Sequence, residues 1–173
     1  MTESLEQRVQ RIEAMDAIRQ LKAHYCMYAD DPQNAREFAD LFLEDAILDE
    51  GEDFMILHGR EEIFRAHLAT WQHTSMNQHF AVSPVINLRG TSADGHWKLL
   101  QLITTQSGED QRAFWACGWY QERYLHTADG WKFQHVEARI HFCSPYEDGW
   151  AKNPFAELLP RATVEGIVLA AKG

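Results

Sequence analysis

The chain of 173 residues is poor in cysteine and in basic residues, and it has no long hydrophobic run. Its three cysteines show no C-x-x-C spacing, which favours reduced cysteines over a disulfide or metal framework. A net charge of −10 disfavours nucleic acid, because such binding needs Lys and Arg to displace counterions. No apolar stretch approaches the ~20 residues of a membrane span, and the N-terminus lacks the pattern of a signal peptide. We therefore expect a soluble, cytoplasmic protein with no nucleic-acid or membrane partner.

Several catalytic signatures are also missing from the sequence. It contains no glycine-rich dinucleotide or phosphate loop, no G-x-S-x-G nucleophile elbow and no H-E-x-x-H zinc motif. The nine histidines are scattered over helix, loop and strand patterns, which disfavours a metal site. We therefore predict that the protein uses no cofactor and no metal, and that proton transfer by side chains is the chemistry that remains.

The spacing of apolar residues divides the chain into a helical part and a β-rich part. A capping box at Ser4 and Gln7 predicts a first short helix, and Asp16 predicts the start of a second. That helix should end at Asp30 or Asp31, because a proline follows. Further helices are expected at 35–42 and 61–71, and strands at 46–48, 54–58, 76–88, 96–106, 112–126 and 131–143.

The four long strands are separated by turn residues that predict hairpin connections: Gly90, Asp94–Gly95, Ser107–Gly108 and Asp129–Gly130. Helices that precede an antiparallel meander indicate an α+β fold in which a curved sheet closes over the helices. Residues 1–145 should form this domain. Residues 146–173 should be an extended tail of it, with an apolar end at 164–171 that covers a subunit interface or the mouth of a pocket.

His79 is the best candidate for acid/base chemistry. Histidine titrates near neutral pH, and a carboxylate that orients its far nitrogen makes it a better base. Asp30 and Asp31 at the end of the second predicted helix can supply that carboxylate, although helical geometry does not choose between them. The alternative is that His79 is a hydrogen-bonded structural residue and that both acids only terminate a helix.

The last predicted strand carries a row of polar residues on one face: His135, Glu137, Arg139 and His141. The row either faces water or lines a cavity, where the Arg139 guanidinium would clamp a carboxylate or polarise a carbonyl. The strands are also rich in aromatic residues, which suit an apolar pocket for a ring-bearing or acyl substrate: Trp97, Trp115, Trp119, Tyr120, Tyr124 and Trp131.

The order and spacing of several short segments also resemble a known family: Ala17–Tyr25 followed by Asp30, Phe42–Ala46, Gly59–Ile63, Gln78–Phe80, Gly118–Tyr120 and Asp129–Phe133. They are similar to the SnoaL-like branch of the nuclear transport factor 2-like (NTF2-like) superfamily, over about residues 5–145. Within that branch the likeness is to the cofactor-free enzymes bile acid 7α-dehydratase, scytalone dehydratase and hexachlorocyclohexane dehydrochlorinase. The resemblance implies a cone-shaped α+β barrel that is often a trimer.

The resemblance also implies roles for individual residues. The family's His-Asp dyad falls on His79 and Asp30, and the tyrosine and late-strand arginine of the bile acid enzyme fall on Tyr25 and Arg139. The second catalytic histidine of scytalone dehydratase falls near Thr104, so that enzyme's substrate and mechanism are not expected here. The residues expected in the substrate pocket are Tyr28, Trp97, Thr104 and Tyr120.

The sequence and the resemblance together favour a dehydratase-type lyase that acts on a small hydrophobic hydroxylated carbonyl compound, such as a steroid, polyketide or aromatic compound. His79 would take the C–H proton, Asp30 would orient the imidazole, and Tyr25 and Arg139 would hold the carbonyl or leaving hydroxyl. Three alternatives stay open: a non-catalytic small subunit of an aromatic ring-hydroxylating dioxygenase, a ligand-binding protein, and an isomerase like ketosteroid isomerase. We expect a homo-oligomer, with a trimer as first choice and a dimer as second.

Overall fold

The structure is a computed structural model that describes residues 3–52 and 54–173. Its helices are α1 (Leu5–Ala29), the short 3-10 helix η1 (Pro32–Asn34), α2 (Ala35–Asp40), α3 (Arg60–Thr70) and α4 (Arg161–Lys172). Its strands are β1 (Phe42–Asp49), β2 (Ile56–His58), β3 (Thr74–Arg89), β4 (Ser92–Ser107), β5 (Asp110–Thr127) and β6 (Gly130–Pro145). The expected α+β class is confirmed.

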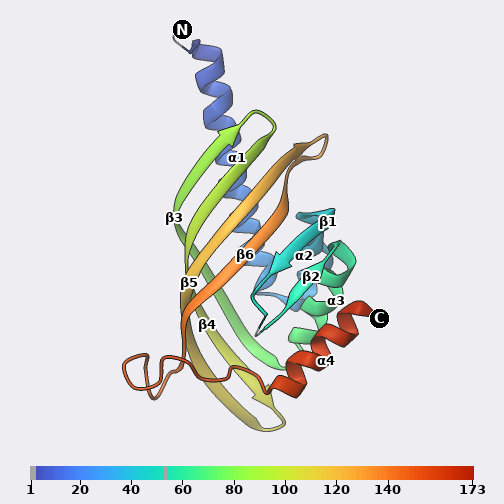
Figure 1. Ribbon diagram of the computed structural model, residues 1–173, viewed down its shortest axis with the longest axis vertical. Helices are drawn as coiled ribbons and strands as arrows, with labels where there is room; N and C mark the ends of the chain where they lie inside the picture. The colour runs from blue at the N-terminus through green and yellow to red at the C-terminus, as the bar shows by residue number, and fades with distance from the viewer. Residues whose placement is uncertain (1–2, 53) are drawn as a thin grey trace.

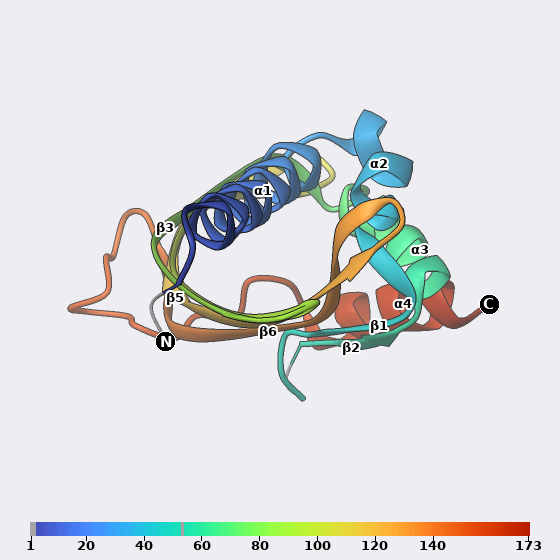
Figure 2. The same ribbon diagram turned by 90° about the horizontal axis from the view of Figure 1, so that it is seen from above.

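The six strands form one curved sheet with the order β2-β1-β6-β5-β4-β3. The expected meander from β3 to β6 is antiparallel throughout, whereas β1 pairs with β6 in parallel. The sheet is not closed, so β2 and β3 are its two edges. Figure 2 shows α1 along the concave side of the sheet, with α3 and α4 beside β1. These helices therefore lie on the side toward which the sheet curves (Figure 2).

A glycine is needed at one position in β5, beside β6. The register of these strands shifts between Cys117 and Gly118, which is a bulge that bends the sheet. A Cβ atom added at Gly118 would lie 2.1 Å from the carbonyl oxygen of Arg139, a distance that no side chain tolerates. Glycine is also required at position 95, because a Cβ atom there would lie 2.7 Å from the ring of Tyr124. Gly95 thus lies inside β4 and does not form the predicted turn.

The two predicted N-terminal helices are a single helix, α1. The capping box at Ser4 and Gln7 is present, but Asp16 lies inside the helix, because no glycine or proline interrupts residues 5–29. The first turns extend beyond the sheet (Figure 1). Within the part of the chain that the structure describes, no helix is both long and apolar enough to cross a membrane.

Two other segments differ from the prediction. The strand expected at 46–48 begins four residues earlier, at Phe42, which the sequence placed in the preceding helix. The C-terminal apolar run is not extended but forms α4, which packs against α3. The Arg65 side chain of α3 donates a hydrogen bond from Nε to the carbonyl oxygen of Ala171 at 2.6 Å. Packing against α3 buries the apolar face of α4, which the sequence alone could not show.

A buried ion pair attaches α1 to the sheet. Lys22 Nζ lies 2.6 Å from Glu122 Oε1, and the two side chains are only 1% and 0% exposed. The ammonium also lies 3.3 Å from the ring centroid of Tyr120 and 3.8 Å from that of Tyr25. The other oxygen of Glu122 accepts a hydrogen bond from the Tyr124 hydroxyl. Both charges are therefore compensated inside the core.

We predict that Lys22→Met lowers the free energy of unfolding by about 3–5 kcal/mol, because it leaves the buried Glu122 carboxylate without its counter-charge. Arg36→Met is the matched control: Arg36 lies 2.6 Å from Glu61, but both side chains are well exposed, so stability should hardly change. Chemical denaturation of both variants measures the difference. Equal losses in the two variants would contradict an anchoring role for Lys22.

The outer face of the sheet carries an apolar row across four strands. Phe80, Leu100, Cys117 and Phe142 are register partners in turn, from β3 to β6. Phe80 and Leu100 are 45% and 38% exposed. An exposed apolar row of this kind is typical of a surface that another protein covers.

We expect further copies of this chain to cover that row, in a trimer or, as second choice, a dimer. Light scattering at micromolar concentration should give a mass above that of one chain, and Leu100→Lys should lower it. Leu169→Lys makes the same change at an exposed position on α4 and should leave the mass unchanged. A monomeric wild-type protein would count against this prediction.

Candidate active site

A cavity of about 800 Å³ lies between α1, the concave face of the sheet, α3 and the C-terminal segment. Its wall combines apolar side chains with polar and charged ones from the helices, the strands and the C-terminal segment, which suits the binding of a small molecule. Residues 155–159 of the C-terminal segment line it, together with Arg161 and Val164 at the start of α4. The segment after β6 therefore forms part of the cavity wall.

His79 and Asp30 meet at one side of this cavity. His79 Nδ1 lies 2.6 Å from Asp30 Oδ1, so the expected contact is present. The backbone N–H of His79 also donates to both carboxylate oxygens, at 3.1 and 2.9 Å. Asp30 is the C-terminal cap of α1, and the neighbouring Asp31 instead caps η1, where its Oδ1 accepts from the Gln33 N–H. The structure thus pairs Asp30, and not Asp31, with His79.

This pairing holds His79 at the cavity wall. His79 lines the large cavity and Asp30 does not, while both residues line a second hollow beside α1. With Nδ1–H donating to Asp30, Nε2 has a free lone pair and can accept a proton. The two side chains are 11% and 13% exposed, which keeps most water away from their hydrogen bond.

Two tyrosines form the wall beside His79. The Tyr25 ring lies edge-on to the His79 ring, with 6.3 Å between the centroids, and Tyr120 packs edge-on to Tyr25 at 5.8 Å. Burial raises the pKa of both Tyr25 and Tyr120 well above the usual value, and the nearby Glu50 carboxyl raises the pKa of Tyr25 further. Both phenols are therefore neutral at physiological pH and can donate hydrogen bonds into the cavity.

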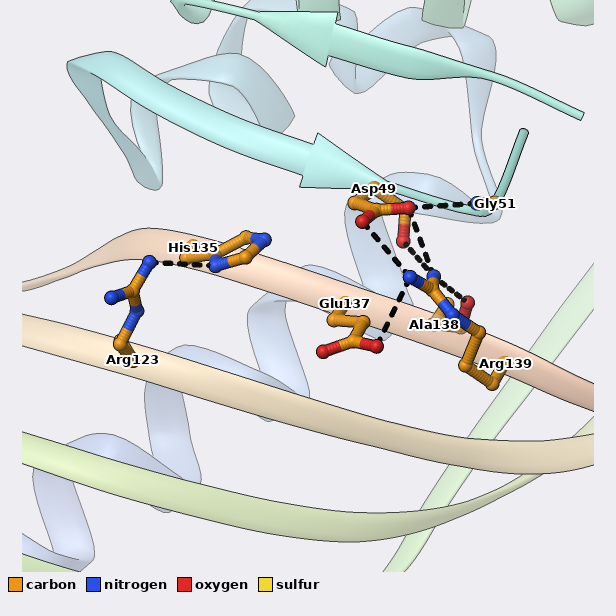
Figure 3. Close-up of polar contacts among 7 residues, drawn as sticks. All are labelled: Asp49, Gly51, Arg123, His135, Glu137, Ala138 and Arg139. Atoms are coloured by element: carbon orange, nitrogen blue, oxygen red, sulfur yellow. Dashed lines mark hydrogen bonds and ion pairs between the residues drawn. The ribbon is translucent and has the colours of Figure 1, made fainter.

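Arg139 borders the cavity, but its guanidinium is bound to carboxylates of the protein. Nη1 and Nη2 donate to the two oxygens of Asp49, both at 2.9 Å, and Nη2 lies 3.0 Å from Glu137 (Figure 3). These hydrogen bonds lower the pKa of Asp49 and raise the pKa of Arg139. His135 in the same row contacts Arg123. These contacts of the polar row on β6 thus link it to β1 and β5. The Arg139 guanidinium, which was expected to bind a substrate, binds Asp49 of the protein itself.

Three of the four residues predicted for the substrate pocket lie elsewhere. Tyr28 is on α1 and stacks on His24, with ring centroids 5.5 Å apart. Trp97 is buried, and its Nε1 donates to the Tyr124 hydroxyl at 2.9 Å. Thr104 points away from the cavity, because its two neighbours in β4 line it. The resemblance located the segments, but it did not show that Thr104 lies on the other face of β4 or that Trp97, on the same face as the cavity residues Leu99 and Gln101, lies outside the cavity.

Two cavity residues, His67 and Glu50, were not identified from the sequence. His67 of α3 stacks on Phe38 at 4.9 Å, and its buried Nε2 has no hydrogen-bond partner among the described residues. Burial lowers the pKa of His67 to about 4. Glu50 directly follows β1 and is half-buried, and burial raises its pKa to about 7. His67 lay in a recognisable apolar helix pattern, whereas nothing distinguished Glu50 from the other acids of its loop.

The chain was also compared with known proteins. Residues 10–137 match the SnoaL-like domain family. The chain belongs to this family. None of the curated proteins matches it. Among residues 3–52 and 54–173 of this SnoaL-like protein, no group of three or more His, Cys, Asp or Glu residues is arranged to hold a metal ion.

Solved structures of the NTF2-like superfamily share its fold at low sequence identity. A proposed aromatic ring hydroxylase from Novosphingobium aromaticivorans is 22% identical, with a TM-score of 0.72, over 79% of this chain and 96% of that one. A proposed scytalone dehydratase of the same organism is 19% identical, with a TM-score of 0.70, over 86% and 97%. A hexachlorocyclohexane dehydrochlorinase of type 3 from Novosphingobium barchaimii is 16% identical, with a TM-score of 0.72, over 88% and 99%.

The buried His67 should make this SnoaL-like protein sensitive to acid. Its pKa falls from the ordinary 6.5 to about 4 on folding, so the unfolded chain binds a proton in that range and the folded one does not. The contribution of neutral His67 to the free energy of unfolding is therefore complete above pH 6.5 and is lost as the pH falls toward 4. Wild type should lose about 2–3 kcal/mol more than His67→Gln over this range.

Denaturant titrations at several pH values measure this difference. His141→Gln, at an exposed histidine on β6, is the matched control and should follow the wild type. If His67→Gln shows the same pH dependence as the wild type, then His67 is not held neutral by burial.

Proposed function

We propose that this protein is a cofactor-independent lyase of the dehydratase type. Its substrate would be a hydrophobic compound that carries a carbonyl group and a hydroxyl group on the second carbon from it. The observation that supports this best is the 2.6 Å contact between Asp30 and His79 at the wall of an apolar cavity of about 800 Å³. A histidine oriented by a carboxylate can take a proton from carbon without a metal or cofactor when the acidity of the C–H bond is raised by a carbonyl.

In the first half of the reaction, His79 Nε2 takes the proton from the carbon next to the carbonyl. The electron pair of the broken C–H bond forms an enolate, whose oxygen accepts hydrogen bonds from the neutral phenols of Tyr25 or Tyr120. The Asp30 carboxylate stabilises the positive charge on the imidazolium. His79, Tyr25 and Tyr120 line the cavity with their rings in contact in turn, and Asp30 contacts His79.

In the second half, the enolate re-forms the carbonyl and its electron pair becomes the new C=C bond. The C–O bond to the hydroxyl group breaks, and His79 returns its proton to the departing oxygen, so that water leaves. Acid/base catalysis of this kind contributes ~10²–10⁴-fold in rate, and positioning of the substrate in the cavity supplies the rest. The Nη1 and Nη2 groups of Arg139 could hold the carbonyl only by leaving Asp49 and Glu137.

Structural relatives named for dehydration and dehydrochlorination support an elimination reaction, although at 16–19% identity the likeness itself extends only to the fold. The relative named as an aromatic ring hydroxylase favours a second candidate, a non-catalytic small subunit of a ring-hydroxylating dioxygenase. An isomerase would use the same proton abstraction but return the proton to a different carbon. The products formed from a substrate distinguish these functions.

We predict that a screen of hydroxylated steroids, acyl thioesters and polyketides reveals a substrate that loses water. His79→Ala should lower kcat by at least ~10²-fold, because it removes the proposed base. Asp30→Asn should lose most of the rate, because a neutral amide cannot stabilise the imidazolium. Asp31→Asn changes the adjacent acid, which caps η1, and should retain the wild-type rate.

Chelators should have no effect on turnover. Activity that survives His79→Ala, or that disappears with EDTA, would contradict the mechanism. Copurification of the chain with a large iron-bearing subunit would instead support the second candidate. Circular dichroism of each variant establishes that the fold is intact.

A further inference from the structure

Glu50 reaches the cavity from the opposite end of the sheet to His79. In the order β2-β1-β6-β5-β4-β3, Glu50 follows β1 near one edge, whereas His79 lies on β3 at the other edge. Both side chains line the same cavity, with Tyr120 of β5 between them in the order of strands. The substrate would therefore lie between a histidine on one side and a carboxyl group on the other.

Hydrogen bonds of Glu50 and of the residues on both sides of it hold this segment of the chain in place. The Asp49 side chain is clamped by two hydrogen bonds from Arg139 at 2.9 Å and accepts a third from the Gly51 N–H at 2.8 Å (Figure 3). Gly51 has a φ of +95°, which favours glycine at this turn. The Glu50 N–H itself donates to the Met55 carbonyl at 2.9 Å. The Asp49 side chain thus binds Arg139, whereas Glu50, the next residue, lines the cavity.

We propose that Glu50 is a second proton-transfer residue of this cavity, which donates its proton to the departing hydroxyl group while His79 takes the C–H proton. This inference rests on the proposed function and divides its two proton transfers between two residues. The Glu50 O–H bond breaks and a new O–H bond forms on the leaving oxygen, so that water departs. The carboxylate and the imidazolium that result then return to their starting states by proton exchange with water.

The surroundings of Glu50 favour the protonated form of its carboxyl group. Burial is the main reason that its pKa is about 7, and the adjacent Asp49 carboxylate adds to it. An ordinary glutamate has a pKa of about 4.3 and would be ionised at neutral pH. The acid form should persist below about pH 7 and disappear above it. Several other titratable or charged residues line the same cavity: Tyr25, Glu52, His67, His79, Tyr120, Arg139, Cys143, Glu157 and Arg161.

The inference can be tested with 4-hydroxy-4-phenylbutan-2-one, an aryl β-hydroxy ketone whose dehydration gives a conjugated, absorbing enone. Glu50→Gln should lower kcat for this probe by about 10²-fold and remove the fall in rate above about pH 7. Glu50→Asp keeps a carboxyl group and should recover part of the rate, which a purely structural role would not explain. Glu44→Gln, at an exposed glutamate of β1, should behave as wild type over the whole pH range.

A second measurement does not depend on turnover. In the full-length protein labelled with ¹³C at glutamate side chains, one carboxyl signal should titrate near pH 7, and it should be missing in Glu50→Gln. A titration near the ordinary value of about 4.3 would overturn the inference, because the residue would then be ionised at neutral pH.

The outcomes separate this inference from the proposed function. If His79→Ala abolishes dehydration but Glu50→Gln does not change it, then His79 performs both transfers and only the role of Glu50 is overturned. If the wild type shows no dehydration that depends on His79, then both are overturned. The assignment is supported if Glu50→Gln no longer shows the fall in rate above about pH 7 and if the Glu50 carboxyl signal of the wild type titrates near pH 7.

Discussion

The ion pair between Lys22 and Glu122 is the interaction on which the rest of the structure depends. A charge deep in a protein core is tolerated only when a partner and hydrogen bonds replace the lost water. Lys22 can satisfy this requirement only when α1 lies along the concave face of the sheet, where Glu122 and the rings of Tyr25 and Tyr120 surround its ammonium. The pair therefore sets the position of the helix that supplies Tyr25 and Asp30.

The site is built where this helix ends. Asp30 caps α1 and binds both the ring and the backbone N–H of His79, so one carboxylate joins the helix to the edge strand β3. At the other end of the sheet, Arg139 holds Asp49 and thereby the loop that carries Glu50. The two ends of an open sheet are thus tied in place by carboxylates, and the cavity lies between them.

Burial determines the chemistry that this cavity can support. It keeps Tyr25, Tyr120 and His67 neutral at physiological pH, and it holds the Glu50 carboxyl group near its midpoint of titration. Neutral donors and acceptors around an apolar space suit a reaction in which protons move and no permanent charge is bound. The SnoaL-like fold alone does not select this reaction, so the proposal rests on the side chains at the wall.

The sequence by itself determined the elements whose signals are local. Alternation and turn glycines located the long strands, the capping box located the start of α1, and the family resemblance brought Asp30 and His79 together. Only the tertiary structure decided what depends on distant neighbours. It continued α1 through Asp16 and paired Lys22 with Glu122, which is 100 positions away. Local patterns describe the face of an element, whereas burial and pairing depend on the residues that another part of the chain places against it.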